Sequence, residues 1–143
     1  YKKSPNSLRI KKVCAVKNFR VLIASHSPLH LRSLQRMIGQ GGHQVIHASN
    51  GAEAMDHLDK QSVDLCFLQD TLPNESGLEF CQTYTNAAET EHIPIVIFSR
   101  RPELEPEALA KGVADFLKMP CQTQEALGLV ENWCQMIRSP NNG

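Results

Sequence analysis

The stretch DLCFLQDTLPNESG, residues 64–77, is an apolar run followed by a turn. The run predicts a short buried strand, and Pro73 and Gly77 indicate the turn. The strand ends on Gln69, and the carboxylate of Asp70 follows one residue later. Side chains at the carboxyl end of a strand are the ones that α/β domains offer to a ligand. An amide in that place limits the chemistry of the site.

Strand and helix patterns alternate on both sides of this stretch. The apolar runs predict strands at residues 19–24, 44–48, 65–69, 94–99 and 113–117. Capping residues and apolar stripes predict helices that begin near residues 28 and 51, and others at 77–87, 103–111 and 122–138. Alternation with apolar middle strands predicts a parallel sheet covered on both faces. We therefore expect one doubly wound, five-stranded α/β domain over residues 19–138.

Composition excludes several classes of protein. No stretch reaches the roughly 18 apolar residues of a membrane span, and no signal-peptide pattern opens the chain, so we expect a cytoplasmic location. The five cysteines form no C-x-x-C pair, which argues against a zinc site and against a disulfide framework. The sequence SHSPLH after the first strand lacks the glycines of a dinucleotide-binding loop.

Charge is uneven along a chain whose formal net charge is zero. Residues 1–20 contain seven Lys and Arg and no acid, whereas the remaining residues contain eight basic and 15 acidic side chains. We interpret residues 1–18 as a basic linker or the end of a preceding domain, and residues 139–143 as a tail. The first residue is Tyr1 rather than Met, so we expect the chain to be a piece of a longer protein.

Five segments, in this order and spacing, connect the domain with a known family: VLIASHSPLHLRSLQRMI, ASNGAEAMDHL, DLCFLQDTLPNESGLEF, PIVIFSRR and GVADFLKMP. Over residues 19–138 the chain resembles bacterial response-regulator receiver domains. The resemblance implies a flavodoxin-like (βα)5 fold and a role in two-component signalling or a phosphorelay. The parent protein of such a domain can be a hybrid sensor histidine kinase, although the domain itself is not an enzyme.

The resemblance also assigns positions to a phosphorylation pocket. Receiver domains have an acid pair after the first strand, an acceptor aspartate after the third, a hydroxyl after the fourth and a lysine before a proline after the fifth. The family uses these groups to hold Mg²⁺ and a phosphoryl group from a histidine kinase. In this chain the positions are occupied by Ser25 and His26, Gln69, Ser99 and Met119.

These replacements favour a domain that has lost phosphotransfer. A neutral amide is a poor nucleophile for phosphorus, so we expect no phosphorylation of Gln69. Magnesium prefers hard oxygen ligands, and no carboxylate occupies the positions of the family's acids, so we expect Mg²⁺ binding to be lost and no other cofactor. With the acids absent, a buried lysine would lack a partner, and Met119 avoids that cost. The prediction is a non-phosphorylatable pseudo-receiver that acts by contact.

Two alternatives remain open. In the first, Asp70 is the phosphoacceptor and Lys118 replaces the lysine, which requires two compensating bulges. Without bulges we expect both to face away from the cleft, because neighbouring strand residues point to opposite faces. The simpler interpretation is that Asp70 is a loop carboxylate, which can serve as a cap, and Lys118 a surface charge. In the second, Arg100 and Arg101 hold a small anionic ligand in the strand-end cleft. The simpler interpretation is that these arginines are solvated and balance the negative charges of the acids in residues 103–107.

Partner contacts are expected on the last part of the domain. Phe116 occupies the position of the family's switch aromatic, and core packing is the simpler role for it. Leu129 and Met136 lie off the main apolar stripe of the last helix, on a face that receivers use for dimers or output. We expect a protein or neighbouring signalling domain as partner, a histidine kinase or an output domain, and a homodimer is compatible with this face. We expect no nucleic acid or membrane contact by this domain.

Overall fold

The computed structural model describes residues 19–60, 63–87 and 93–138; the predicted linker 1–18 and tail 139–143 lie outside these residues. Five parallel strands form one sheet, β2(Arg20–Ala24), β3(Gln44–Ala48), β4(Leu65–Gln69), β7(Ile95–Ser99) and β8(Asp115–Lys118). Their spatial order is β3-β2-β4-β7-β8. The predicted flavodoxin-like (βα)5 fold is confirmed.

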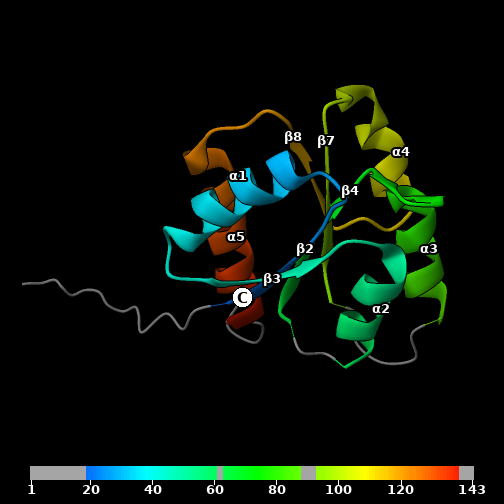
Figure 1. Ribbon diagram of the computed structural model, residues 1–143, viewed down its shortest axis with the longest axis horizontal. Helices are drawn as coiled ribbons and strands as arrows, with labels where there is room; N and C mark the ends of the chain where they lie inside the picture. Colours follow the sequence, from blue (N-terminus) through cyan, green and yellow to red (C-terminus); the bar gives the residue numbers. More distant parts are fainter. Residues whose placement is uncertain (1–18, 61–62, 88–92, 139–143) are drawn as a thin grey trace, which may run out of the picture.

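Helices cover both faces of the sheet (Figure 1). Two of them, α1(Pro28–Gly39) and α5(Thr123–Arg138), lie on one face. The opposite face is covered by α2(Gly51–Asp59), α3(Gly77–Ala87) and α4(Glu105–Ala110). Among the described residues, no helix combines the length and apolar character that a bilayer crossing needs.

Local sequence signals determine where the first two helices begin. The Ser27 side chain accepts a hydrogen bond from the backbone N–H of His30, and Pro28 occupies the first turn of α1. The Asn50 side chain caps α2 in the same way, through the N–H of Glu53. Both helices start where the sequence predicts them.

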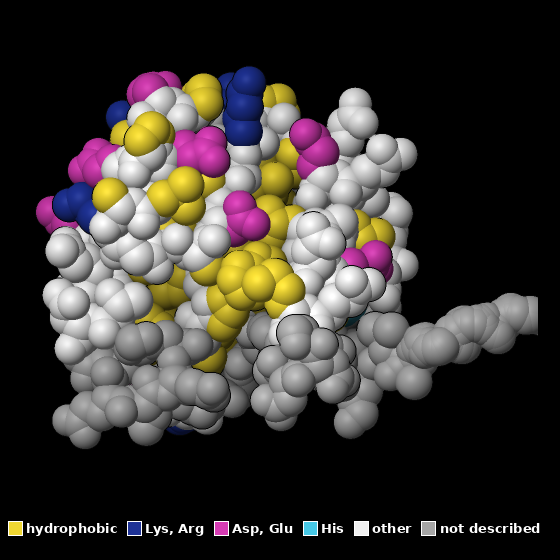
Figure 2. Space-filling model, turned by 180° about the vertical axis from the view of Figure 1, so that it is seen from behind, with side chains coloured by type: hydrophobic (Ala, Val, Ile, Leu, Met, Phe, Trp, Pro, Cys, Tyr) yellow, Lys and Arg dark blue, Asp and Glu magenta, His cyan; other side chains and the backbone are white. Residues whose placement is uncertain are grey.

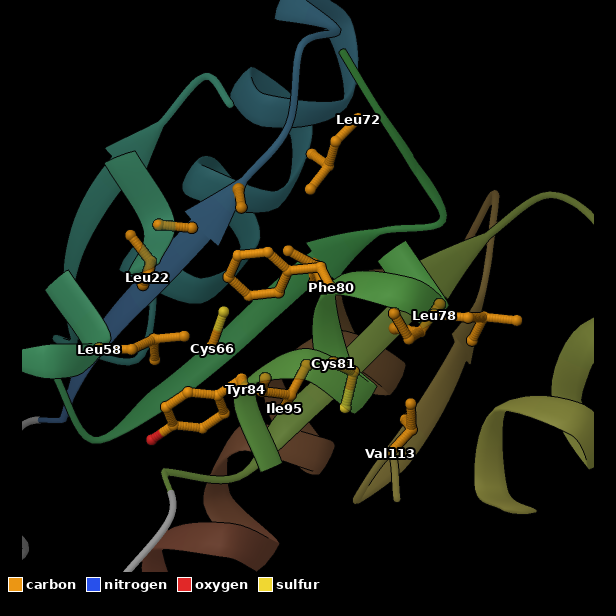
Figure 3. Packing of buried hydrophobic residues seen from close by; sticks show 14 of the residues in the cluster. Leu22, Leu58, Cys66, Leu72, Leu78, Phe80, Cys81, Tyr84, Ile95 and Val113 are labelled. Atoms are coloured by element: carbon orange, nitrogen blue, oxygen red, sulfur yellow. The ribbon is translucent and has the colours of Figure 1, made fainter. Parts of the chain in front are cut away.

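Two apolar layers fill the space between the sheet and the helices. One lies under α2, α3 and α4, and Figure 3 shows its side chains, among them Leu22, Cys66, Phe80 and Tyr84. The other lies under α1 and α5 and includes Phe19, Phe67 and Phe98. Because β2, β4 and β7 are buried on both faces, their side chains alternate between the two layers.

The structure differs from the predicted elements mainly between β4 and α3. A two-stranded antiparallel ribbon, β5(Thr71–Leu72) with β6(Glu75–Ser76), forms there. Asn74 turns the ribbon with a positive φ of 73°. The weak helix predicted at 103–111 is a short 3-10 turn, η2(Pro102–Leu104), followed by α4. Two-residue strands leave too short a pattern for periodicity to detect.

Candidate functional site at the carboxyl ends of the strands

Strand register brings the predicted pocket residues together. Ala24 pairs with Leu68, and Gln69 pairs with Phe98, so β2, β4 and β7 end side by side. Ser25, Gln69, Ser99 and Met119 are all buried at this edge of the sheet. The sequence therefore placed these four side chains in the correct region, although it gave no information on their contacts.

A short hydrogen bond joins the ends of β2 and β4. The hydroxyl of Ser25 lies 2.6 Å from Oε1 of Gln69, to which it donates, in a buried setting. The same hydroxyl accepts the backbone N–H of Ser27 at 3.0 Å. Because Oε1 of the buried Gln69 amide accepts the hydrogen bond from Ser25, Gln69 serves as a structural link between two strands.

Asp70 does not face away from the cleft, and our expectation on this point is wrong. Its Oδ2 accepts a hydrogen bond from the hydroxyl of Ser99 at 2.9 Å, and its side chain is only 12% exposed. The alternation argument fails because β4 ends at Gln69. Beyond that residue the chain turns, with the carbonyl of Asp70 bound by the N–H of Gly77 at 2.7 Å. The carboxylate therefore reaches the end of β7.

Arg101 pairs with Asp70, at 3.5 Å between Nη2 and Oδ2, rather than with the acids of residues 103–107. Its backbone N–H also donates to the hydroxyl of Ser99 at 2.9 Å. The anion that Arg101 contacts is thus the protein's own. Arg100 is exposed and has no ion pair among residues 19–60, 63–87 and 93–138.

The other predicted residues divide between core and surface. His26 is exposed, and Lys118 is exposed on the edge strand β8, as expected for a surface charge. Met119 is buried in the layer under α1 and α5. Within the described part of the chain, no three side chains of His, Cys, Asp or Glu gather closely enough to hold a metal ion.

The residues predicted for switching and output differ in exposure. Phe116 is buried in the layer under α2, α3 and α4, so it belongs to the core. Leu129 is half-buried and packs against the other layer. Met136 is 59% exposed. Figure 2 shows the molecule from behind the view of Figure 1, where hydrophobic side chains form a central furrow with acidic side chains on both sides.

His30, in the first turn of α1, is a further residue at this site. Its ring packs edge-on against Phe98, with centroids 6.0 Å apart. Burial, and next the charge of Arg100, lower the pKa of His30. Its Nδ1 is buried and has no hydrogen-bond partner in the described residues. The presence of His30 at this site follows from the tertiary contact of α1 with the end of β7, which the sequence pattern does not reveal.

Comparison with known proteins gives a consistent result. The family model described as "Response regulator receiver domain" matches residues 21–131. The chain is 27% identical over 110 residues to Protein PilH of Pseudomonas aeruginosa, which covers 76% of this chain and 91% of PilH. It is 29% identical over 102 residues to the autoinducer sensor kinase/phosphatase CqsS of Vibrio cholerae, across 68% of this chain and 15% of CqsS.

Solved structures share the fold. A response regulator from Chloroflexus aurantiacus superimposes with a TM-score of 0.76 at 22% identity, across 83% of this chain and 99% of that one. A chemotaxis response regulator of Vibrio cholerae gives a TM-score of 0.72 at 21% identity, across 82% and 99%. The chain spans nearly all of these structures and of PilH, but a small part of CqsS.

Proposed function

Because this chain belongs to the response regulator receiver family, we propose that it is a pseudo-receiver of two-component signalling that accepts no phosphoryl group. It acts by contact with a protein partner or a neighbouring signalling domain. The observation that carries the proposal is the 2.6 Å hydrogen bond between Ser25 and Gln69. An amide stands where the family has its acceptor aspartate, and a neutral partner stands where the family has an acid.

The donor set does not fit Mg²⁺. The ion requires near-octahedral oxygen coordination, and proteins usually supply one or two carboxylates for it. At the matching positions the chain has a hydroxyl, an exposed imidazole and an amide, from Ser25, His26 and Gln69. The nearby carboxylate of Asp70 is already bound by Ser99 and Arg101. Without the metal, charge that builds up on an attacked phosphoryl group has no counter-charge.

Acetyl phosphate with Mg²⁺, followed by intact mass measurement, tests the proposal. We expect no gain of a phosphoryl mass by the wild-type chain. A variant with the family residues restored, S25D/H26D/Q69D/M119K, is the positive control. Any labelling that it shows should be absent from the matched variant S25D/H26D/M119K, which keeps Gln69. Stoichiometric phosphorylation of the wild-type chain would overturn the proposal.

A second candidate function is phosphotransfer, with Asp70 as the residue that accepts the phosphoryl group. The position of its carboxylate, 2.9 Å from the hydroxyl of Ser99 and 3.5 Å from a guanidinium nitrogen of Arg101, favours it. Against it stands the pairing itself, because a carboxylate held by a cation and a hydroxyl donor is a weaker nucleophile. The Asp70→Asn variant separates the two functions: it abolishes labelling if Asp70 is the acceptor.

We place the partner surface on α4, β8 and α5. Leu109 of α4 and Met136 of α5 are large hydrophobic side chains that remain 47% and 59% exposed. Large hydrophobic side chains that stay exposed occur at contact surfaces. Similarity to part of the sensor kinase/phosphatase CqsS supports a place within a larger signalling protein such as a hybrid kinase, for which we propose a cytoplasmic location. Size-exclusion chromatography of the wild-type chain and the L109S/M136S variant tests a homodimer through this surface.

A further inference from the structure

Two hollows meet at the strand ends and share two side chains. The first hollow, of about 270 Å³, is lined mainly by apolar groups: Leu29, His30, Ser33, Met37, Arg100, Met119, Pro120 and Cys121. The second, of about 300 Å³, is lined by polar and apolar groups together, among them Gln69, Asp70, Ser99 and Arg101. His30 and Arg100 line both. The two hollows therefore adjoin at these two residues, and together they are called the strand-end cleft below.

The apolar hollow lies between α1 and the segment that follows β8. In Figure 1 this segment runs above α1, on the face of the sheet that α5 also covers. Met119 forms part of the floor. At the mouth, Leu29 is 74% exposed, which leaves a large apolar side chain beside an apolar opening. Such a lining suits a hydrocarbon group.

Charge at the boundary of the hollows is not balanced. Asp70 is paired with Arg101, so its negative charge already has a counter-charge. Arg100, the residue immediately before Arg101, has no ion pair among the described residues. His30 adds no negative charge, and its ring is held in place by Phe98. An anionic group is therefore the complement of this boundary, and a guanidinium can bind a carboxylate through two parallel hydrogen bonds.

We propose that this cleft binds a small amphipathic carboxylic acid, whose carboxylate contacts Arg100 and whose hydrocarbon chain lies between Met37 and Met119. Each hollow is close to the lower end of the size range of small-molecule sites, roughly 300–1,000 Å³. The ligand class is accordingly a single short chain rather than a two-chain lipid. This site is separate from the exposed surface of α4 and α5, so its occupancy can be tested whatever the outcome of the phosphorylation experiment.

Octanoate is the probe, and amide NMR titration of the chain is the measurement. We expect saturable shifts at the start of α1, at Arg100 and at Cys121. Acetate lacks the chain and 1-octanol lacks the charge, so each should bind at least about tenfold more weakly than octanoate, a difference of about 1.4 kcal/mol. Shifts of equal size and midpoint with 1-octanol would overturn the role of Arg100.

Three variants complete the test. Arg100→Ala should weaken octanoate binding at least about tenfold, the loss expected for a hydrogen bond to a charged group. Ser33→Trp should block the apolar hollow from a half-exposed helix position. Arg32→Ala is the matched control, because Arg32 is an exposed cation of the same helix that lines neither hollow. Binding that survives both Arg100→Ala and Ser33→Trp unchanged would refute the site.

Discussion

The hydroxyl of Ser25 lies 2.6 Å from Oε1 of Gln69 and links the ends of two neighbouring strands. In a phosphorylatable receiver the same two positions carry acids that repel each other unless a cation lies between them. Here one neutral donor faces one neutral acceptor. A buried hydrogen bond of this kind adds to the stability of the fold.

Ser25→Ala should lower the free energy of unfolding by about 1–3 kcal/mol, because it leaves the buried amide oxygen of Gln69 without its donor. The double variant S25A/Q69L should recover most of that loss, since it replaces both polar partners with apolar groups. Urea denaturation measures both. Ser33→Ala, which removes a half-exposed hydroxyl, is the control and should change little. Equal losses in the single and double variants would contradict the assignment.

Ser99→Ala should destabilise the domain more than Arg101→Ala. The hydroxyl of Ser99 donates to Asp70 and accepts from the backbone N–H of Arg101, and it is buried. Loss of its bond to a carboxylate costs about 1.5–3 kcal/mol. The side chain of Arg101 is 58% exposed, so its ion pair contributes about 0–1 kcal/mol.

The salt dependence of these two variants provides an independent check. The effect of Arg101→Ala should shrink as ionic strength rises, because ions screen an exposed pair. The effect of Ser99→Ala should persist, because the hydrogen bond is largely shielded from solvent. The reverse order of the two variants in urea denaturation would show that the ion pair, rather than the hydroxyl, holds Asp70.

Sequence reasoning predicted the fold, and it placed Gln69 and Ser99 at the ends of neighbouring strands, but it predicted the direction of Asp70 wrongly. Periodicity and capping residues act locally, which explains why α1 begins at Pro28 as expected. The orientation of Asp70 depends on where the pleat stops, and that point is set by a contact between its carbonyl and Gly77. The pairing of Arg101 and the packing of His30 against Phe98 likewise depend on tertiary geometry.

Stability should decrease as pH falls below about 6.5, the ordinary pKa of histidine. Burial lowers the pKa of His43, whose Nδ1 accepts the backbone N–H of Phe19 at 3.1 Å. Because the folded pKa is lower than the unfolded one, the unfolded chain binds protons first. The stabilisation is therefore complete above the unfolded pKa and is lost as pH falls toward the folded pKa.

Urea denaturation between pH 5 and pH 8 tests this expectation. In the His43→Asn variant the amide oxygen takes the position of Nδ1 and can still accept the N–H of Phe19 but does not titrate, so the pH dependence should become shallower. Part of it should remain, since the pKa of His30 is also lowered by burial and by Arg100. An unchanged slope in His43→Asn would exclude His43 as a source of the pH dependence.

Gly77→Ala and Gly128→Ala should change stability in opposite directions. A Cβ on Gly77 would collide with the backbone carbonyl of Gln69 and approach Cα of Asp70, neither of which can move without disturbing the end of β4. We expect a loss of roughly 1–3 kcal/mol, as for other overpacked positions. A Cβ on Gly128, within α5, meets no atom within 4 Å, so alanine should stabilise that helix by about 0.5–1 kcal/mol.

Urea denaturation measures the stability of both variants. Because Gly77 also positions Asp70, only the Gly77→Ala variant should change the amide NMR signal of Ser99. A stabilised Gly77→Ala would mean that the turn after β4 is looser than these contacts require.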